Sequence, residues 1–185
     1  MDKGIILDPG GTNGITLDCH VDADFAGNWN LTDSADPNAA RSRTGHLIAL
    51  ENAPVLWRSK RITDICLSMM EAEYIALSMS MRSLLHLRGM LFEIDSIFSL
   101  DLGSKLSSIS TVYEDNRAAQ ILATTDPPRV TPRSKHLAVK WHWFRSHLSD
   151  EIVIAAVLSA DNKGDIFTKS LPRDAFERHR KTICG

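Results

Sequence analysis

The chain carries, at residues 17–22, the stretch Leu17-Asp18-Cys19-His20-Val21-Asp22, in which apolar and polar side chains alternate. A period of two is typical of a β-strand with one buried face. Two further strand-like runs follow at residues 43–50 and 54–59, with only Glu51-Asn52-Ala53 between them. So short a connection favours antiparallel pairing, and the three runs together predict a three-stranded antiparallel meander.

The rest of the chain alternates helix patterns with strand patterns. Ser68-Met69-Met70-Glu71 is a capping box that begins a helix expected to end near Ile94, with a loop or broken helix from Asp95 to Ser110. Two further strands are predicted at residues 109–115 and 152–158. Further helices are predicted at residues 117–123 and 134–147, after a cap at Asp161, and from Pro172 to Lys181. This order predicts an α/β domain, a five-stranded mixed sheet with two parallel strands, flanked by helices.

Length and composition indicate an ordinary globular domain. The 185 residues are enough to bury a core, and 43% hydrophobic and 24% charged residues are usual proportions. No apolar run approaches the roughly 20 residues that span a bilayer, and no signal peptide is recognisable, so we expect an intracellular protein with no membrane partner. The cysteines, Cys19, Cys66 and Cys184, lack paired metal-ligand spacing, which favours reduced thiols.

The charges are unevenly distributed, although the net charge is only −2. Residues 15–38 contain five acids and no lysine or arginine, whereas residues 129–147 contain five basic residues and no acid. An acidic focus beside basic flanks suits a metal site that handles a polyanion. The alternative interpretation is that these segments are simply two solvated faces.

Four acidic residues stand where a predicted strand ends or a predicted helix begins: Asp22, Glu73, Asp115 and Asp165. In α/β sheets, ligand sites form at strand ends and at the helix starts beside them. Helix phase separates Glu73 from Glu71, because Glu71 lies about 200° round the helix and serves the cap. Strand alternation alone does not choose between Asp22 and Asp24, which have the same parity.

Carboxylates that converge need cations between them, because otherwise they repel one another and their pKa values rise. Oxygen ligands without histidine or cysteine favour Mg²⁺ or Mn²⁺ over zinc. Two such ions roughly 3.5–4 Å apart can activate a water and stabilise the leaving oxygen of a phosphodiester. A single aspartate at a strand end or helix start is ordinarily only a cap, so the surrounding motifs decide between the two interpretations.

The motifs around these acids form an ordered set. They are Val21-Asp22-Ala23-Asp24-Phe25-Ala26-Gly27, Ser42-Arg43-Thr44-Gly45, Trp57-Arg58-Ser59-Lys60, Glu71-Ala72-Glu73-Tyr74-Ile75-Ala76-Leu77, Tyr113-Glu114-Asp115-Asn116, Arg133-Ser134-Lys135-His136, and Asp165-Ile166-Phe167-Thr168-Lys169 followed by Leu171-Pro172. In this order they resemble the RNase H domain of copia-type (pseudovirus) retrotransposon Pol polyproteins, where it follows the reverse transcriptase. The resemblance runs from about Leu17 to Arg180. Residues 1–14 look like a linker from the polymerase, so the domain is expected at residues 15–185.

The resemblance implies an RNase H-like fold with two Mg²⁺ or Mn²⁺ ions held by Asp22, Glu73, Asp115 and Asp165. It thereby prefers Asp22 to Asp24. It further implies hydrolysis of the RNA strand of RNA–DNA hybrids, the reverse transcriptase of the same polyprotein as partner, and a cytoplasmic location within virus-like particles. The chain departs from the pattern at Ala138, where an acid is usual, and residues 159–164 lack a histidine that many RNases H carry there. The alternatives are a non-catalytic nucleic-acid-binding or structural module of the same fold, and a related nuclease that acts on DNA.

A set of polar and basic residues is predicted to contact the nucleic acid: Arg43, Lys60, Asn116, Arg133, Lys135, His136 and Lys140. Basic side chains would meet phosphates, and Asn116 would touch a ribose 2′-hydroxyl. The competing interpretation is that the basic residues are solvated and that Asn116 only caps a helix.

Overall fold

The computed structural model describes residues 15–32, 35–99, 106–125, 135 and 141–184. One sheet holds five strands, β1 (Leu17–Asp24), β2 (Arg43–Leu50), β3 (Ala53–Arg61), β4 (Ser110–Glu114) and β5 (Ile152–Ala156), in the order β3-β2-β1-β4-β5. β1 pairs antiparallel with β2, and β2 with β3, whereas β4 pairs parallel with both β1 and β5. The predicted mixed sheet is therefore confirmed. The predicted linker at residues 1–14 lies outside the described residues.

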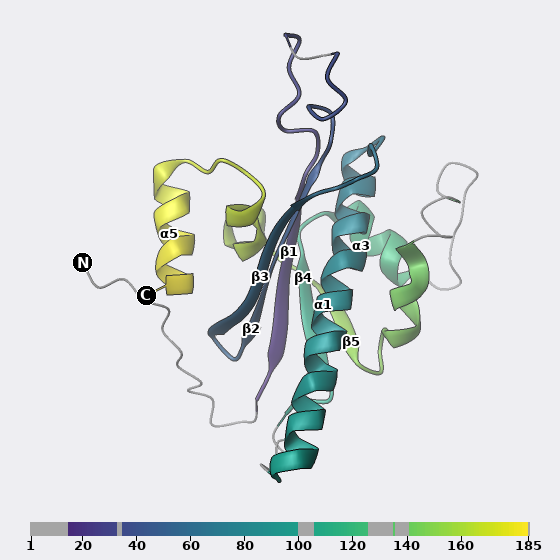
Figure 1. Ribbon diagram of the computed structural model, residues 1–185, viewed down its shortest axis with the longest axis vertical. Helices are drawn as coiled ribbons and strands as arrows, with labels where there is room; N and C mark the ends of the chain where they lie inside the picture. The colour runs from purple at the N-terminus through teal and green to yellow at the C-terminus, as the bar shows by residue number, and fades with distance from the viewer. Residues whose placement is uncertain (1–14, 33–34, 100–105, 126–134, 136–140, 185) are drawn as a thin grey trace.

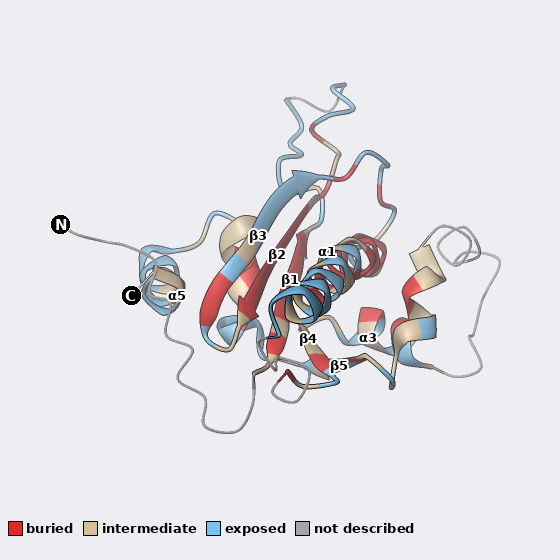
Figure 2. Ribbon diagram, turned by 60° about the horizontal axis from the view of Figure 1, so that its bottom comes forward, coloured by how far each residue is buried: buried red, intermediate tan, exposed pale blue. Residues whose placement is uncertain are grey.

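Helices cover both faces of the sheet (Figure 1). α1 (Met69–Phe98) and α3 (Arg117–Thr124) lie on one side, and α5 (Arg173–Cys184) lies on the other, next to the 3₁₀ helix η3 (Lys163–Phe167). Figure 2 shows the buried residues in the central strands and on the face of α1 that meets them, whereas α5 is mostly exposed. Within the described residues, no helix combines the length and apolar character needed to cross a membrane. The three cysteines are free, as predicted.

α1 begins where the capping box predicts. The Ser68 side chain accepts from the N–H of Glu71, and Glu71 Oε2 accepts from the N–H of Leu67 at 2.8 Å. Its inner face buries large side chains completely, among them Tyr74 and Leu77. Burial of each such side chain contributes about 1.5–3 kcal/mol, which anchors the helix to the sheet.

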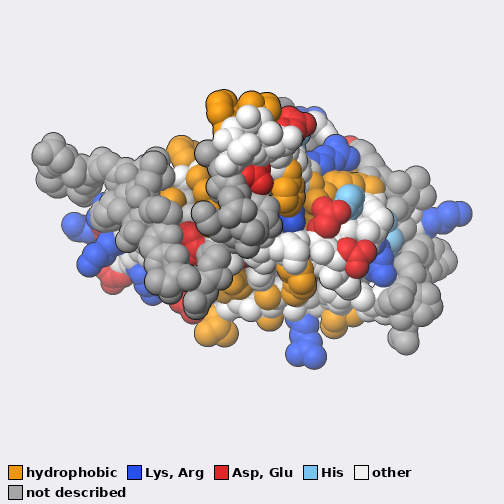
Figure 3. All heavy atoms as spheres, turned by 90° about the horizontal axis from the view of Figure 1, so that it is seen from below, with side chains coloured by type: hydrophobic (Ala, Val, Ile, Leu, Met, Phe, Trp, Pro, Cys, Tyr) orange, Lys and Arg blue, Asp and Glu red, His pale blue; other side chains and the backbone are white. Residues whose placement is uncertain are grey.

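The predicted end of this helix at Ile94 is wrong by four residues. α1 continues to Phe98 and closes at Ser99, whose φ of 50° is left-handed and whose N–H donates to the carbonyl of Asp95. The last turns extend past the sheet and leave large side chains exposed, among them Ile97 and Phe98. Hydrophobic side chains gather at this end of the molecule in Figure 3. The apolar pattern stopped indicating a helix there because those turns no longer face the core.

The segment predicted as a helix at residues 134–147 is described only in part, and its end is a 3₁₀ helix, η1 (His142–His147). Phe144 is fully buried in the core. Arg145 donates to the carbonyl of Leu122 at 2.9 Å and to that of Ala123 at 2.6 Å. These bonds satisfy carbonyls at the end of α3, so tertiary contacts, rather than helix propensity, fix this segment.

Candidate active site

Carboxylates from four separate elements converge where the parallel strands β1 and β4 end. Asp22, Asp115 and Asp165 have carboxylate oxygens that all lie within 4.8 Å of one another, and the same holds for Glu73, Glu114 and Asp115. The two groups share Asp115. The structure thus brings together the four acids proposed from the sequence and adds a fifth, Glu114.

Asp22 lies in β1, and its fully buried side chain contacts Thr168 and Lys169, the two residues that follow η3. Thr168 Oγ1 donates to Asp22 Oδ2, and Lys169 Nζ lies 2.9 Å from Asp22 Oδ1 and 3.2 Å from Asp165 Oδ1. Burial, and next the charge of Asp22, raise the pKa of Asp165 to about 6. Burial opposes the charged form of Lys169, but Asp22 and Asp165 outweigh it and raise the pKa of Lys169 above its ordinary value. Lys169 therefore acts as the counter-charge of both aspartates.

η3 docks closely on β1 and β2 because glycine stands on both sides of the contact. A β-carbon on Gly164 would lie 2.9 Å from the backbone nitrogen of Asp22. A β-carbon on Gly45 would lie 2.7 Å from Cγ2 of Thr168, the residue that follows η3. Asn162 holds the same contact, since its Nδ2 donates to the carbonyl of Val21 at 2.8 Å and its Oδ1 accepts from the N–H of Gly164 at 3.1 Å. This docking sets the position of the last carboxylate relative to the first.

The residue that caps η3 is Asn162, and the predicted cap at Asp161 is wrong. Asp161 is exposed and ends a separate 3₁₀ helix, η2 (Ser159–Asp161), whereas Asn162 is fully buried. Asparagine and aspartate are nearly equal as caps, so local propensity does not separate them. The buried position requires a side chain that both donates and accepts, which an amide does and a carboxylate does not.

Glu73 and Glu114 form a buried acidic pair under the first turn of α1. Glu73 is 3% exposed and Glu114 is 0% exposed, and each has an Oε2 without a hydrogen-bond partner among the described residues. Burial, and next the charge of Glu114, raise the pKa of Glu73 to about 10. Burial likewise raises the pKa of Glu114 well above its ordinary value. Without a cation, burial and mutual repulsion therefore favour the form of the pair that retains a proton.

Sequence reasoning missed Glu114 because its phase is opposite to that of Asp115. Glu114 lies on the opposite face of β4 from Asp115, in line with the fully buried Val112. The helix that carries Glu73 covers that face, and this is why Glu114 comes close to Glu73. An acid that ends a strand in register with core residues was the available signal. Glu71, by contrast, is used by the cap, as helix phase predicted.

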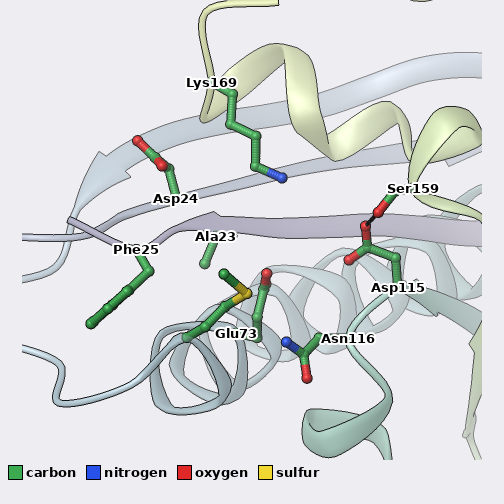
Figure 4. A pocket seen from close by; sticks show the side chains of 9 residues that line it. Ala23, Asp24, Phe25, Glu73, Asp115, Asn116, Ser159 and Lys169 are labelled. Carbon is green, nitrogen blue, oxygen red and sulfur yellow. Dashed lines mark hydrogen bonds between the residues drawn. The ribbon is translucent and has the colours of Figure 1, made fainter. Parts of the chain in front are cut away.

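A pocket of about 260 Å³ opens over these groups, lined by Ala23, Asp24, Phe25, Met69, Glu73, Asp115, Asn116, Ser159 and Lys169. In Figure 4, Lys169 and Ser159 reach it from one side, and Glu73 and Asn116 from the other. Ser159 Oγ donates to Asp115 Oδ2. The carboxylate of Asp24 points away from Asp115 in the same view. The two aspartates that strand alternation left open thus have different surroundings, and only Asp22 belongs to the carboxylate group.

Of the predicted nucleic-acid contacts, several lie outside the described residues: Arg133, His136 and Lys140. Lys135 is exposed. Asn116 caps α3, because its Oδ1 accepts from the N–H of Ala119 at 3.0 Å. It also lines the pocket, so the cap and a contact with substrate are compatible.

Arg43 and Lys60 lie on opposite faces of the sheet. Arg43 in β2 lies directly opposite Asp24 in the register with β1, and Asp24 is on the same face of the sheet as Asp22. Lys60 pairs with Thr44, whose Oγ1 faces α1 and lies 3.9 Å from Met79 Sδ. The two basic residues therefore do not form one surface, and Arg43 is the one on the face of Asp22.

Comparison with known proteins agrees with this architecture. No protein-family model matches the chain. The chain is 30% identical over 183 residues to the retrovirus-related Pol polyprotein from transposon RE2 of Arabidopsis thaliana, covering 98% of this chain and 11% of the relative. It is 31% identical over 175 residues to the corresponding polyprotein from transposon TNT 1-94 of Nicotiana tabacum, covering 94% of this chain and 12% of the relative. The chain thus spans about a tenth of the length of these relatives.

Solved structures share the fold at low sequence identity. The N-terminal RNase H domain of Rv2228c from Mycobacterium tuberculosis superposes with a TM-score of 0.56 and 13% identity, covering 91% of this chain and 98% of that one. LC11-RNase H1, solved in complex with an RNA/DNA hybrid, gives 0.52 and 13%, covering 88% and 98%. The chain therefore has the RNase H fold, and its homologues are retrovirus-related Pol polyproteins of copia-type transposons, as its motifs predicted.

Proposed function

We propose that the chain is a metal-dependent ribonuclease H that hydrolyses the RNA strand of RNA–DNA hybrids. The observation that carries the proposal is the pair of three-carboxylate groups that share Asp115 where β1 and β4 end. Asp22, Glu73, Asp115 and Asp165 would bind the ions. The hybrid found with LC11-RNase H1 supports this substrate for the shared fold.

The side chains present fit two hard divalent cations. All the candidate ligands are carboxylate oxygens, which Mg²⁺ and Mn²⁺ prefer, and Glu73 Oε2 is buried without a partner among the described residues. When bound, such ions supply an activated water and neutralise the charge on the leaving oxygen of a phosphodiester. Mg²⁺ is the expected cofactor, with Mn²⁺ as a substitute.

The residues of the chain have distinct tasks in this proposal. Ser159 orients the carboxylate of Asp115, and Lys169 keeps Asp22 and Asp165 together. Arg43, on the face of Asp22, would contact a phosphate of the hybrid. Water attacks the RNA phosphodiester in line and leaves 3′-hydroxyl and 5′-phosphate ends. No side chain forms a covalent bond to the substrate.

The rest of the polyprotein enters as part of the same proposal. Because the chain spans about a tenth of its Pol relatives, a reverse transcriptase in the same polyprotein is the natural partner, with residues 1–14 as the linker to it. Such a domain would work in the cytoplasm, within virus-like particles, where the hybrid is made.

A cleavage assay on a hybrid with labelled RNA tests the proposal, with Mg²⁺, Mn²⁺ or EDTA present. Asp115→Asn should lower the rate by about 100-fold or more, the order seen when a group that stabilises transition-state charge is removed. Asp150→Asn is the matched control, since Asp150 is exposed. Cleavage in EDTA, or full activity of Asp115→Asn, would refute the mechanism. A wild-type protein that binds the hybrid but leaves it intact would support the non-catalytic alternative.

A further inference from the structure

Glu114, the last residue of β4, is held in one orientation by its surroundings. Its Oε1 accepts from the N–H of Asn116 at 2.8 Å, and Gln120 Nε2 donates to its backbone carbonyl at 2.6 Å. The residue is 0% exposed. The other carboxylate oxygen, Oε2, has no hydrogen-bond partner among the described residues.

An unpartnered carboxylate oxygen at such depth is costly unless something binds it. Leaving a buried acceptor unsatisfied costs about 1–3 kcal/mol, and more for a charged group. One carboxylate oxygen of Glu114 nevertheless lies within 4.8 Å of one oxygen of Glu73 and one of Asp115. Glu73 Oε2 is unpartnered as well. Hydrogen bonding to the described residues therefore does not explain why three acids meet here.

The spacing suits a shared cation. Oxygen ligands lie about 2.0–2.6 Å from Mg²⁺ or Ca²⁺, so two ligands of one ion are at most about 5 Å apart. Lys169, the counter-charge of Asp22 and Asp165, forms its ion pairs with the other carboxylate group. A cation beside Glu114 would balance the group that Lys169 does not pair with.

We propose that Glu114 is a metal ligand, and that it binds one divalent cation together with Glu73 and Asp115. The inference rests on the proposed function for the presence of a metal centre, and it adds a fifth carboxylate to that centre. Asp115, which belongs to both carboxylate groups, would then be shared between this ion and the group formed with Asp22 and Asp165. Three observations support this role for Glu114: its carboxylate lies beside Glu73 and Asp115, it is fully buried, and its Oε2 has no hydrogen-bond partner among the described residues.

Glu114→Gln tests the proposal by calorimetric titration with Mn²⁺. The amide has the shape of the carboxylate and retains an oxygen that can accept from the N–H of Asn116, but it removes the charge. Mn²⁺ affinity should fall about tenfold or more, because mutating even the residues that hydrogen-bond to metal ligands typically lowers metal affinity by about 10–100-fold. The melting temperature in EDTA should stay equal or rise, because repulsion with Glu73 is removed, and the gain on adding Mn²⁺ should shrink. Glu93→Gln, an exposed position on α1, is the control and should change neither quantity.

The outcomes separate this inference from the proposed function. Equal Mn²⁺ affinity in Glu114→Gln and wild type would overturn it and leave Glu114 a structural acid, even if the wild type cleaves hybrids. A wild type that binds no Mn²⁺ would overturn both proposals. A wild type that binds Mn²⁺ through Glu114 without cleaving would overturn only the function. If Glu114→Gln does not fold, Glu114→Asp withdraws the charge by one methylene and should also weaken binding; an unchanged affinity would overturn the inference.

Discussion

Replacing Lys169 with methionine would test whether this side chain holds the carboxylates together when no divalent ion is bound. The ammonium bridges Asp22 and Asp165, whose side chains are 0% and 11% exposed, whereas that of Lys169 is 36% exposed. Removing one partner of a buried pair costs about 3–5 kcal/mol, and of an exposed pair about 0–1 kcal/mol. Because Lys169 is partly exposed, we expect Lys169→Met to lower the free energy of unfolding in EDTA by about 2 kcal/mol.

Saturating Mg²⁺ should reduce this loss, since a bound cation then supplies the counter-charge. If about 1.4 kcal/mol of the loss disappears, linkage requires the variant to bind Mg²⁺ about tenfold more tightly than the wild type. Urea unfolding followed by tryptophan fluorescence, in EDTA and in Mg²⁺, measures both quantities. Lys181→Gln, at an exposed position of α5, should stay within about 0.5 kcal/mol of the wild type. An equal loss with and without Mg²⁺ would refute the view that Lys169 and the cation serve the same carboxylates.

Three further outcomes follow from the same geometry. Gly164→Ala should cost about 2 kcal/mol or more in urea unfolding, because its methyl would lie 2.9 Å from the β1 backbone, and Gly45→Ala should cost a similar amount, because its methyl would lie 2.8 Å from the β-carbon of Phe167. Gly89→Ala, whose methyl would meet nothing within 4 Å, is the control, and an unchanged stability of Gly164→Ala would contradict this. Burial is the main reason why the pKa of Asp165 is raised from 3.8 to about 6. At a pH between these two values, the folded protein therefore holds a proton on Asp165 that the unfolded chain does not hold. Stability in EDTA should therefore fall as pH rises from about 4 to 6, and Mn²⁺ affinity measured calorimetrically should rise over that range; a flat profile would contradict it. Arg43→Gln should weaken hybrid binding and reduce the salt slope by about 1, as filter binding would show, and Lys60→Gln should do so less.

The sequence was sufficient wherever the information is local. Strand alternation predicts β1 to within two residues of its end, and the Ser68 capping box predicts the start of α1 and the use of Glu71. These features depend on neighbours one to four positions apart along the chain. The same local phase separated Glu73 from Glu71 because it fixes the direction of a side chain on a helix.

Contacts between distant segments are what the sequence did not supply. The sequence predicts Asp161 as the helix cap, whereas Asn162 is the cap in the structure. The hydrogen bond that distinguishes Asn162 is made to the carbonyl of Val21, which is 141 residues away along the chain. Arg43 and Lys60 were grouped together because their opposite faces follow from the register between β2 and β3, which pairs Lys60 with Thr44. Tertiary register decides such cases, and a single sequence without aligned relatives does not contain it in a readable form.

The assembly of five acids at one point requires a scaffold that tolerates their repulsion before a cation arrives. β1 provides it, since it is paired on both sides, with β2 and with β4, and is sealed by α1 over its apolar face. η3 then completes the site by a contact so close that only glycine fits at residue 164. Because β1 and η3 are packed in this way, Asp22 and Asp165 stay close together, and their repulsion is relieved by Lys169, by protonation or by a metal ion. The rigidity that makes the metal-free site unfavourable is thus what would give the bound ions a fixed geometry, and relaxing it at Gly164 should weaken metal binding as well as folding.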